Sequence, residues 1–387
     1  MDPTVYAIPM YFGSMGVEQA LLRRRAKRLG VAPGDSPGDY EWRDTAASLT
    51  MGVGSLLAPL VVPHILGPLT PGKGRFGKVL VVTAAAAMAT TVIADQLARL
   101  NPSTMTKPLD TSPSSTSDFI ESPRTCRRHQ VGRIARKVAS IGAITTVAAT
   151  GVAITSAVTA GMSSRTSKRF AGSNDAVAPS GADRAAGLAT LAVATLGWDF
   201  IYYWNHRFMH SSRFMWAIHS VHHSSERYNL STALRQPVAD GLGIFAPYSA
   251  LTLLGIRPEV ITQARAINLL YQYWIHTDLI DRIGPFESIL NSPSHHRVHH
   301  GVNPRYLDRN HGSILILWDR LFGTFERENE PVVYGLTTNI DTFNPALVAT
   351  REYRDIGRDI SSSPSWRQRL SFVLRGPGWS YEQHAAA

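Results

Sequence analysis

The sequence contains one cysteine, Cys126, among its 387 residues. A single thiol excludes internal disulfides, cysteine-ligated iron–sulfur clusters and cysteine-rich zinc sites. Any metal that the chain binds is therefore held by histidine or carboxylate side chains. Two further motifs are missing, because neither an HExxH stretch nor a dinucleotide fingerprint occurs. Their absence argues against a zincin peptidase, and it indicates that electrons for any redox reaction come from a separate donor.

Acidic residues are fewer than basic ones, with 29 Asp and Glu against 39 Lys and Arg, so the formal net charge is +10. This balance suits a nucleic-acid binder or a membrane protein with basic cytoplasmic loops. The basic residues here flank apolar segments, as they do in membrane proteins. We therefore expect no nucleic acid among the partners of this protein.

Apolar stretches of about 20 residues alternate with basic or Ser/Pro-rich stretches, and 20 apolar residues suffice for a helix to cross a bilayer. The predicted spans cover residues 4–22, 46–68, 76–98, 138–162 and 185–204, followed by a helical hairpin at 238–256 and 258–275. The pattern predicts an all-α fold, a polytopic membrane helical bundle. The histidine motifs described below add to this expectation a cytoplasmic histidine-rich di-metal cap.

The orientation follows from the basic loops. Six Lys and Arg residues occur in 23–45 and eight in 99–137, which predicts that both loops face the cytoplasm and that the N-terminus lies outside. Four basic residues in 163–184 run against this arrangement. Five spans then deliver residue 205 to the cytoplasmic side, where the dense histidine clusters follow.

The predicted organisation has four parts. They are N-terminal transmembrane helices (1–100), polar linkers flanking an extra apolar segment (101–184), a catalytic domain (185–350) and a cytoplasmic C-terminal tail (351–387).

Histidines are concentrated in one region, because ten of the 14 lie between positions 206 and 300. They form the motifs HRFMH (206–210), HSVHH (219–223) and HRVHH (296–300), with His276 and His295 standing apart. Positions i, i+3 and i+4 share one face of a helix, so each motif presents its imidazoles in a single direction. The remaining four are interpreted as ordinary core or surface residues: His64, His129, His311 and His384.

Three converging faces supply about eight nitrogen ligands. An octahedral ion takes about six ligands and tetrahedral zinc about four, so the number favours two metal ions. Neutral imidazole suits iron, copper, nickel and zinc. A redox-active pair beside a membrane favours O2 chemistry. A haem centre fits less well, since its axial ligation needs one or two histidines.

These motifs resemble the sterol desaturase/fatty acid hydroxylase superfamily of membrane di-iron oxygenases, and within it the bacterial sterol C-5 desaturase-like and alkylglycerol monooxygenase-like branch. The resemblance is carried by WDFIYYWNHRFMH (198–210), WAIHSVHHSSERYNLSTALRQ (216–236), LLYQYWIHTDLI (269–280), NSPSHHRVHHGVNPRYLDRN (291–310) and LILWDRLFGTFERE (315–328). It implies a four-helix membrane core with a cytoplasmic metal region, two iron ions as cofactor and O2 as co-substrate.

The resemblance also implies the ligands. The three histidine boxes fall on His206, His210, His219, His222, His223, His296, His299 and His300. His276 matches an isolated histidine and is the expected ninth ligand. His295 is an extra histidine, and it is open whether it is a ligand or a residue that contacts one. The branch usually reads Asn-Tyr-Gly-Gly where this chain reads NHGS (310–313), a departure that bears on substrate orientation more than on metal binding.

Polar residues near the boxes are candidates for orienting the ligands. Asp199 lies near the end of a predicted span, and two roles are open: accepting an imidazole N–H, as metal-bound histidines usually require, or facing lipid headgroups. Asn310 and Asp319 are further candidates for contacting a ligand. Trp318, Asp319 and Arg320 are expected to tie the C-terminal segment to the metal region by packing and an ion pair.

The expected function is O2-dependent desaturation or hydroxylation of a lipid C–H bond, with a sterol or sterol-like lipid as the first choice. The expected partners are a bilayer lipid and a separate electron donor, which is a redox protein or a reduced pterin. The alternatives are alkylglycerol monooxygenase-like cleavage of ether lipids, using a pterin, or fatty acid hydroxylation. A non-catalytic metal-binding membrane protein is the alternative from a different class.

Overall fold

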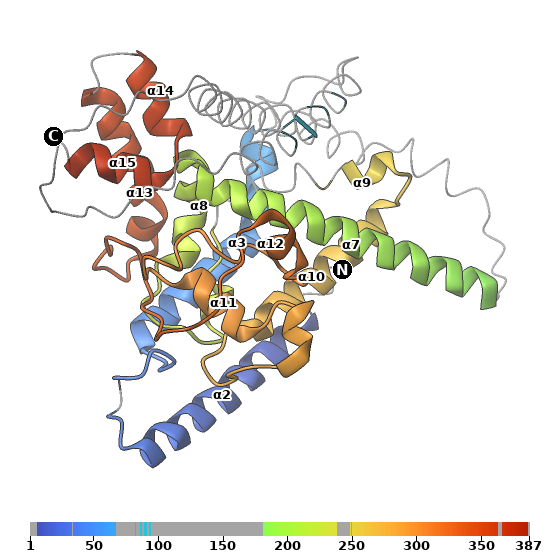
Figure 1. Cartoon of the computed structure of the whole chain (residues 1–387), viewed down its shortest axis with the longest axis horizontal. Coiled ribbons are helices and arrows are strands. Elements are labelled where there is room, and N and C mark those ends of the chain that lie inside the picture. The colour runs from blue at the N-terminus through green and yellow to red at the C-terminus, as the bar shows by residue number, and fades with distance from the viewer. Residues whose placement is uncertain are drawn as a thin grey trace, which may run out of the picture. The chain divides into compact units, whose positions relative to one another are not determined.

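The computed structural model (Figure 1) describes residues 6–32, 34–66, 181–237, 248, 250–362 and 366–385, together with isolated positions between 82 and 93. The chain divides into two units, one formed by residues 1–70 and 167–387 and the other by residues 71–166. Every helix named below belongs to the first unit.

The described part of the chain is helical. Its extended pairing consists of two isolated bridges, Leu290 with Leu315 and Gly301 with Tyr334, and no strand occurs among the described residues. The all-α prediction is confirmed for this part.

The N-terminal helix α2 (Ile8–Leu29) ends where Gly30 adopts a left-handed φ of 67°. Its buried residues are Met15, Glu18 and Leu22, a spacing that places them on one face. Met15 packs with Leu230 in a small apolar cluster, and the backbone N–H of Leu230 donates to the Glu18 carboxylate at 2.9 Å. Helix α2 is thus docked on the segment that follows the second histidine motif.

The first two histidine motifs lie on two consecutive helices, and a third helix packs against the first of them. Helix α7 (Gly181–Ser211) packs against α10 (Pro258–Ile275) and against α8 (Arg213–His223) (Figure 1). Ser212, in an extended conformation, separates α7 from α8 and turns the chain. Pro258 begins α10 because its fixed φ and missing N–H suit the first turn. The α7–α8 corner places two histidine motifs close together.

The third motif lies on the short helix α11 (Pro293–His300). The side chain of Ser292 caps it by accepting a hydrogen bond from the backbone N–H of His295 at 3.4 Å. Helix α12 (Leu317–Phe322) follows and ends at Gly323, which adopts a left-handed φ of 70°. All residues of α11 are buried, which brings its histidines into the interior.

The C-terminal residues form three helices: α13 (Pro345–Ser362), α14 (Trp366–Leu374) and α15 (Pro377–Ala385). Helix α13 packs against α8, and Arg213 at the start of α8 pairs with Glu352 at 2.7 Å and also with Asp359. Asp359 also lies 2.7 Å from Nε2 of His384. The segment predicted as a cytoplasmic tail therefore braces a histidine-bearing helix.

Several predicted spans coincide with described helices: 4–22 with α2, 46–68 with α3 (Trp42–Leu66), 185–204 with α7 and 258–275 with α10. Of the helices that the structure describes, none is both long enough and apolar enough to cross a bilayer. The span at 138–162 lies outside the described residues, as do all but isolated positions of 76–98 and more than half of 238–256. The multi-pass topology and its cytoplasmic side stay predictions.

Candidate metal centre

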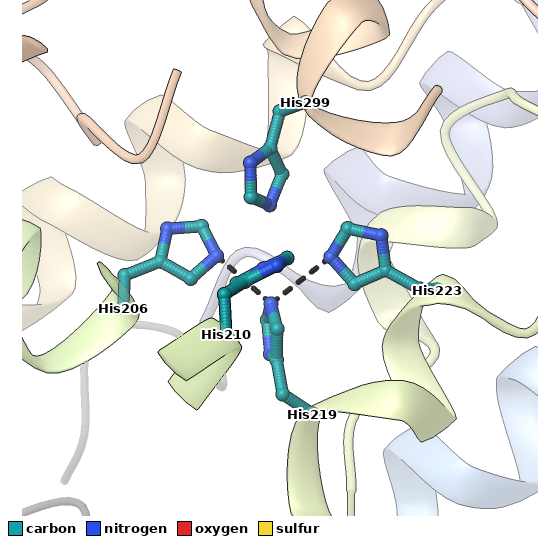
Figure 2. A group of neighbouring side chains, drawn as sticks. All are labelled: His206, His210, His219, His223 and His299. Carbon is teal, nitrogen blue, oxygen red and sulfur yellow. Dashed lines mark hydrogen bonds between the residues drawn. The ribbon is translucent and has the colours of Figure 1, made fainter. Parts of the chain in front are cut away.

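Nine of the ten predicted ligand histidines gather in two buried groups. The five-histidine group consists of His206, His210, His219, His223 and His299, and Figure 2 shows these five rings converging. The four-histidine group consists of His222, His276, His296 and His300. Within each group the available ligand atoms lie within 4.8 Å of one another. Each of the nine residues is at most 7% exposed.

Helical geometry distributes these side chains. His206 and His210 lie one turn apart near the end of α7, and His219 and His223 lie one turn apart on α8. His276 caps the C-terminus of α10. Neighbouring histidines at 222 and 223, and at 299 and 300, point in directions about 100° apart on their helices, so they enter different groups. Helices α8 and α11 therefore serve both groups.

Burial decides the charge of these rings. Desolvation lowers the pKa of His222 to about 4. It also lowers the pKa of seven others well below the usual range: His206, His219, His223, His276, His296, His299 and His300. These rings are neutral near pH 7, and a neutral imidazole is the form that binds a metal.

The four-histidine group shows why a cation fits. Nδ1 of His222 lies 3.3 Å from the carbonyl oxygen of Arg235, and Nδ1 of His276 lies 2.7 Å from that of Gln272. A carbonyl only accepts, so each Nδ1 carries the proton and each Nε2 presents a lone pair. These two Nε2 atoms are 3.1 Å apart. Two lone pairs repel at this distance unless a cation lies beside them.

The distances match a metal site. Metal–nitrogen bonds of about 2.1 Å place adjacent ligand nitrogens about 3.0 Å apart and opposite ones about 4.2 Å apart. The Nε2 atoms of His206 and His219 are 2.8 Å apart, and those of His219 and His223 are 3.1 Å apart. Nε2 of His210 and Nε2 of His299 are buried without a partner among the described residues. The donor set therefore fits one ion in each group.

One backbone segment, residues 308–311, orients three rings of the five-histidine group. Nδ1 of His206 donates to the carbonyl of His311 at 2.8 Å, and Nδ1 of His299 donates to that of Arg309 at 2.9 Å. Nδ1 of His210 lies 3.3 Å from the Asp308 carboxylate. Such outer partners fix the ring tautomer and direct the other nitrogen inward. Asp308 and Asn310 both have φ near +55°, which bends the segment around the rings.

Asp319 holds this segment in place. Its carboxylate accepts from the backbone N–H groups of His311 and Gly312, each at 2.7 Å, and from the Thr324 hydroxyl at 2.7 Å. Burial raises its pKa to about 6. A Cβ at Gly312 would lie 2.8 Å from the carboxylate and 2.6 Å from the carbonyl of Leu315, so only glycine permits this approach. The sequence predicts an ion pair from residues 318–320; among the described residues, Asp319 instead makes these hydrogen bonds.

Asn310 joins the same segment to α11. Its side-chain amide donates to the carbonyls of His295 and Glu326, and its Oδ1 accepts from the backbone N–H of Glu326. It contacts no ligand ring through these bonds. Asn310 acts on the site by positioning the segment.

The contacts of Asp199 match neither of its two predicted roles. Its side chain accepts from the backbone N–H groups of Ile314 and Leu315 and from the indole of Trp318, and the Asn268 amide lies 3.3 Å away. Among these donors none is an imidazole, and at 1% exposed the residue does not face headgroups. Its buried carboxylate ties α7 and α10 to the chain before α12.

His295 lies outside both groups. It comes directly before His296 on α11. Its ring packs edge-on against Phe325, with the ring centroids 5.3 Å apart. Burial lowers its pKa to about 4. Its position on a different side of the helix explains why it does not join the other nine.

Arg235 and Asp44 are site residues whose role the sequence did not reveal. The Arg235 carbonyl accepts from His222, while its guanidinium donates to Asp44 of α3 at 2.9 Å and to the Ser224 hydroxyl at 2.9 Å. Arg235 is 1% exposed and Asp44 is 3% exposed. This ion pair fixes the acceptor for a ring of the four-histidine group. No spacing in the sequence links residue 44 to residue 235.

Comparisons with known proteins match the part of the chain that carries the two histidine groups. Residues 191–324 match the family model described as fatty acid hydroxylase. Human alkylglycerol monooxygenase is 51% identical over 186 residues, covering 48% of this chain and 42% of the relative. The Caenorhabditis elegans alkylglycerol monooxygenase is 40% identical, covering 47% of this chain and 38% of the relative. Ornithine lipid hydroxylase OlsE of Rhizobium tropici is 31% identical, covering 34% of this chain and 40% of the relative.

The chain thus spans about two fifths of the length of these relatives. No solved structure matches the chain.

Proposed function

Because residues 191–324 belong to the fatty acid hydroxylase family, within the sterol desaturase/fatty acid hydroxylase superfamily, we propose that this protein is an iron-dependent monooxygenase acting on lipids. The observation that carries the proposal is the pair of buried groups of five and four imidazoles, each able to hold one ion. Imidazole suits iron, copper, nickel and zinc, and the family match favours iron among them.

We propose an ether lipid of the alkylglycerol type as the substrate. The alkylglycerol monooxygenases of human and C. elegans, at 51% and 40% identity, support this reading better than the sterol lipid that the sequence analysis put first. The ornithine lipid hydroxylase, at 31% identity, is consistent with the broader class of lipid hydroxylation. Hydroxylation of the carbon beside an ether oxygen gives a hemiacetal, which separates into an aldehyde and an alcohol.

When bound, the two ions would activate O2, so that one oxygen atom enters the C–H bond and the other leaves as water with two electrons and two protons from outside the chain. The protein's own residues hold and shield the centre. Neutral rings supply lone pairs from Nε2, and the carbonyls of Arg235, Gln272, Arg309 and His311 keep the ring protons turned outward. Burial of all nine rings limits access of bulk water.

The test is O2 uptake by the full chain in detergent after anaerobic loading with ferrous iron. Substrates are a 1-O-alkylglycerol, a sterol, a fatty acid and an ornithine lipid, each with tetrahydropterin or with a reduced redox protein. We expect about two irons per chain and release of a fatty aldehyde from the alkylglycerol. His222→Ala and His299→Ala should abolish uptake, whereas His295→Ala, outside both groups, should retain it.

A single ion per chain and no O2 uptake with any lipid would sink the oxygenase and favour the non-catalytic metal-binding alternative. Uptake with a sterol or a fatty acid but not with alkylglycerol would keep the oxygenase and overturn the ether-lipid assignment. The two reductants distinguish a pterin from a protein donor.

A further inference from the structure

His311 is a buried histidine that belongs to neither group but lies against one of them. It is 1% exposed and sits on the segment 308–311 that orients the five-histidine group. Its ring centroid is 5.0 Å from that of His210 and 5.6 Å from those of His206 and His299. Three of the five rings therefore surround it.

The tautomer of His311 follows from its hydrogen bond. Nε2 lies 3.1 Å from the carbonyl oxygen of Asp308, so this nitrogen carries the proton and Nδ1 carries a lone pair. Burial lowers the pKa of the ring well below its usual range, which keeps it neutral. Nδ1 is fully buried and has no partner among the described residues. A buried acceptor in a native protein almost always has a donor.

The neighbouring rings cannot supply that donor. His206 directs its Nδ1–H to the carbonyl of His311 itself, and His299 directs its own to Arg309. Nδ1 of His210 faces the Asp308 carboxylate. His206 and His299 thus turn their protons outward and their lone pairs inward, and His210 directs its Nδ1 away from His311 toward the carboxylate. No described residue donates a hydrogen bond to Nδ1 of His311, so its donor is a group outside the described residues.

We propose that His311 is a tenth histidine of the metal centre, whose Nδ1 accepts a hydrogen bond from a water molecule on the ion held by the five-histidine group. The inference rests on the proposed metal centre and adds a residue to it. Five imidazoles leave about one position of an octahedral ion for such a water.

Two isosteric variants separate the roles of the two ring nitrogens. The side-chain amide of Asn reaches the position of Nδ1, whereas that of Gln reaches the position of Nε2. We would load the full chain with cobalt(II) as the probe, measure the affinity of each ion by competition with a chelator, and record the visible absorption. His311→Phe should weaken one of the two ions by about 10–100-fold and shift its ligand-field band, as loss of an outer partner does. His311→Asn should restore both properties, and His311→Gln should not.

His295→Phe is the matched control. His295 is also buried with an unpartnered Nδ1, but it lies outside both groups, so this variant should keep wild-type affinity and absorption for both ions. Wild-type behaviour of His311→Phe, rescue by Gln instead of Asn, or an equal loss in His295→Phe would each overturn the proposal. If His311→Phe fails to fold, the comparison of Asn with Gln decides.

The experiment distinguishes failure of the proposed function from failure of the role proposed for His311. Wild-type protein that binds fewer than two cobalt ions would overturn both proposals. Two ions with the expected variant effects, but no lipid oxidation after iron loading, would overturn the monooxygenase and leave the role of His311 standing.

Discussion

The five-histidine and four-histidine groups share two helices but receive different support. In the five-histidine group, one segment about 100 residues from His206 supplies the acceptors for three rings. In the four-histidine group, His276 uses the carbonyl of Gln272 on its own helix, and His222 uses that of Arg235, 13 residues away. The acceptors of the first group therefore come from a segment distant from His206 and His210, whereas the two acceptors of the second lie near their rings in the sequence.

The number of rings adds to this difference. Five imidazoles leave about one open position on an octahedral ion and four leave about two. An ion proposed for the four-histidine group would be the less completely surrounded of the two, and its group would have no ring to spare. The two ions should therefore respond differently when a ring is lost.

The largest expected effect is a difference in metal content between two variants, each of which removes one ring from one group. His276→Ala leaves three imidazoles and should lose its ion, so that metal content falls to about one per chain. His210→Ala leaves four, enough for a tetrahedral site, and should keep a weakened ion. Both variants should lose more than about 100-fold in activity, since changing outer partners alone costs about 10–100-fold. Metal analysis of the two proteins, each after dialysis, checks this order; equal metal loss would contradict the asymmetry.

Acid should weaken both groups together in chelator-treated protein. Eight rings have folded pKa values below the unfolded value of about 6.5, so their neutral forms stabilise the fold above that pH. This stability is lost as pH falls toward about 4, the folded value for His222, by up to about 1.4 kcal/mol per pH unit for each ring.

Five buried or half-buried carboxyl groups act in the opposite direction, against the eight rings. Burial raises the pKa of Asp319 and Asp199 to about 6, from an unfolded value near 3.9, and it also raises the pKa of Glu18, Asp44 and Asp278. Thermal unfolding measured from pH 7.5 to pH 4.5 should show a steep fall, and bound iron should move the fall to lower pH. A flat profile in the chelated protein would show that the rings are not buried as neutral imidazoles.

Asp44→Ala should weaken the four-histidine group from a distance. It leaves the buried guanidinium of Arg235 without its carboxylate, and breaking a buried pair costs about 3–5 kcal/mol. Denaturant unfolding measures this loss, and the ion of the four-histidine group should be released first. The control is Asp355→Ala, which removes more exposed pairs with Arg351 and Arg358 and should cost less than about 1 kcal/mol. Equal costs would show that the Asp44 pair is unimportant.

Asp319→Asn should weaken the five-histidine group by a smaller amount. The amide cannot accept from all three donors that the carboxylate serves, a loss of about 1–3 kcal/mol. The difference between Asp319 and Asn should shrink below pH 6, because the carboxyl is then protonated. Unfolding at pH 7.5 and at pH 5.5, with metal analysis at the higher pH, checks both statements. Loss of the ion from the four-histidine group instead would contradict this assignment.

Sequence analysis identified all nine histidines of the two groups, because imidazole is chemically distinctive and helical spacing places the histidines of each motif on one face. It also assigned His295 an open role, and only the direction of α11 excludes that ring from both groups. The outer acceptors escaped prediction because they are backbone carbonyls, which every residue carries. Asp44 and Arg235 escaped because their pairing joins segments about 190 residues apart.

The sequence by itself determined which ligands this protein offers a metal: one cysteine excludes thiolate-rich sites, and ten histidines between positions 206 and 300, in three spaced motifs, favour imidazole. The tertiary structure alone decided how these ligands divide into five and four, which nitrogen of each ring faces inward, and that His311 joins their surroundings. The physical reason is that residue type sets what a side chain is able to bind, whereas ring direction and tautomer depend on hydrogen bonds formed only when distant segments pack together.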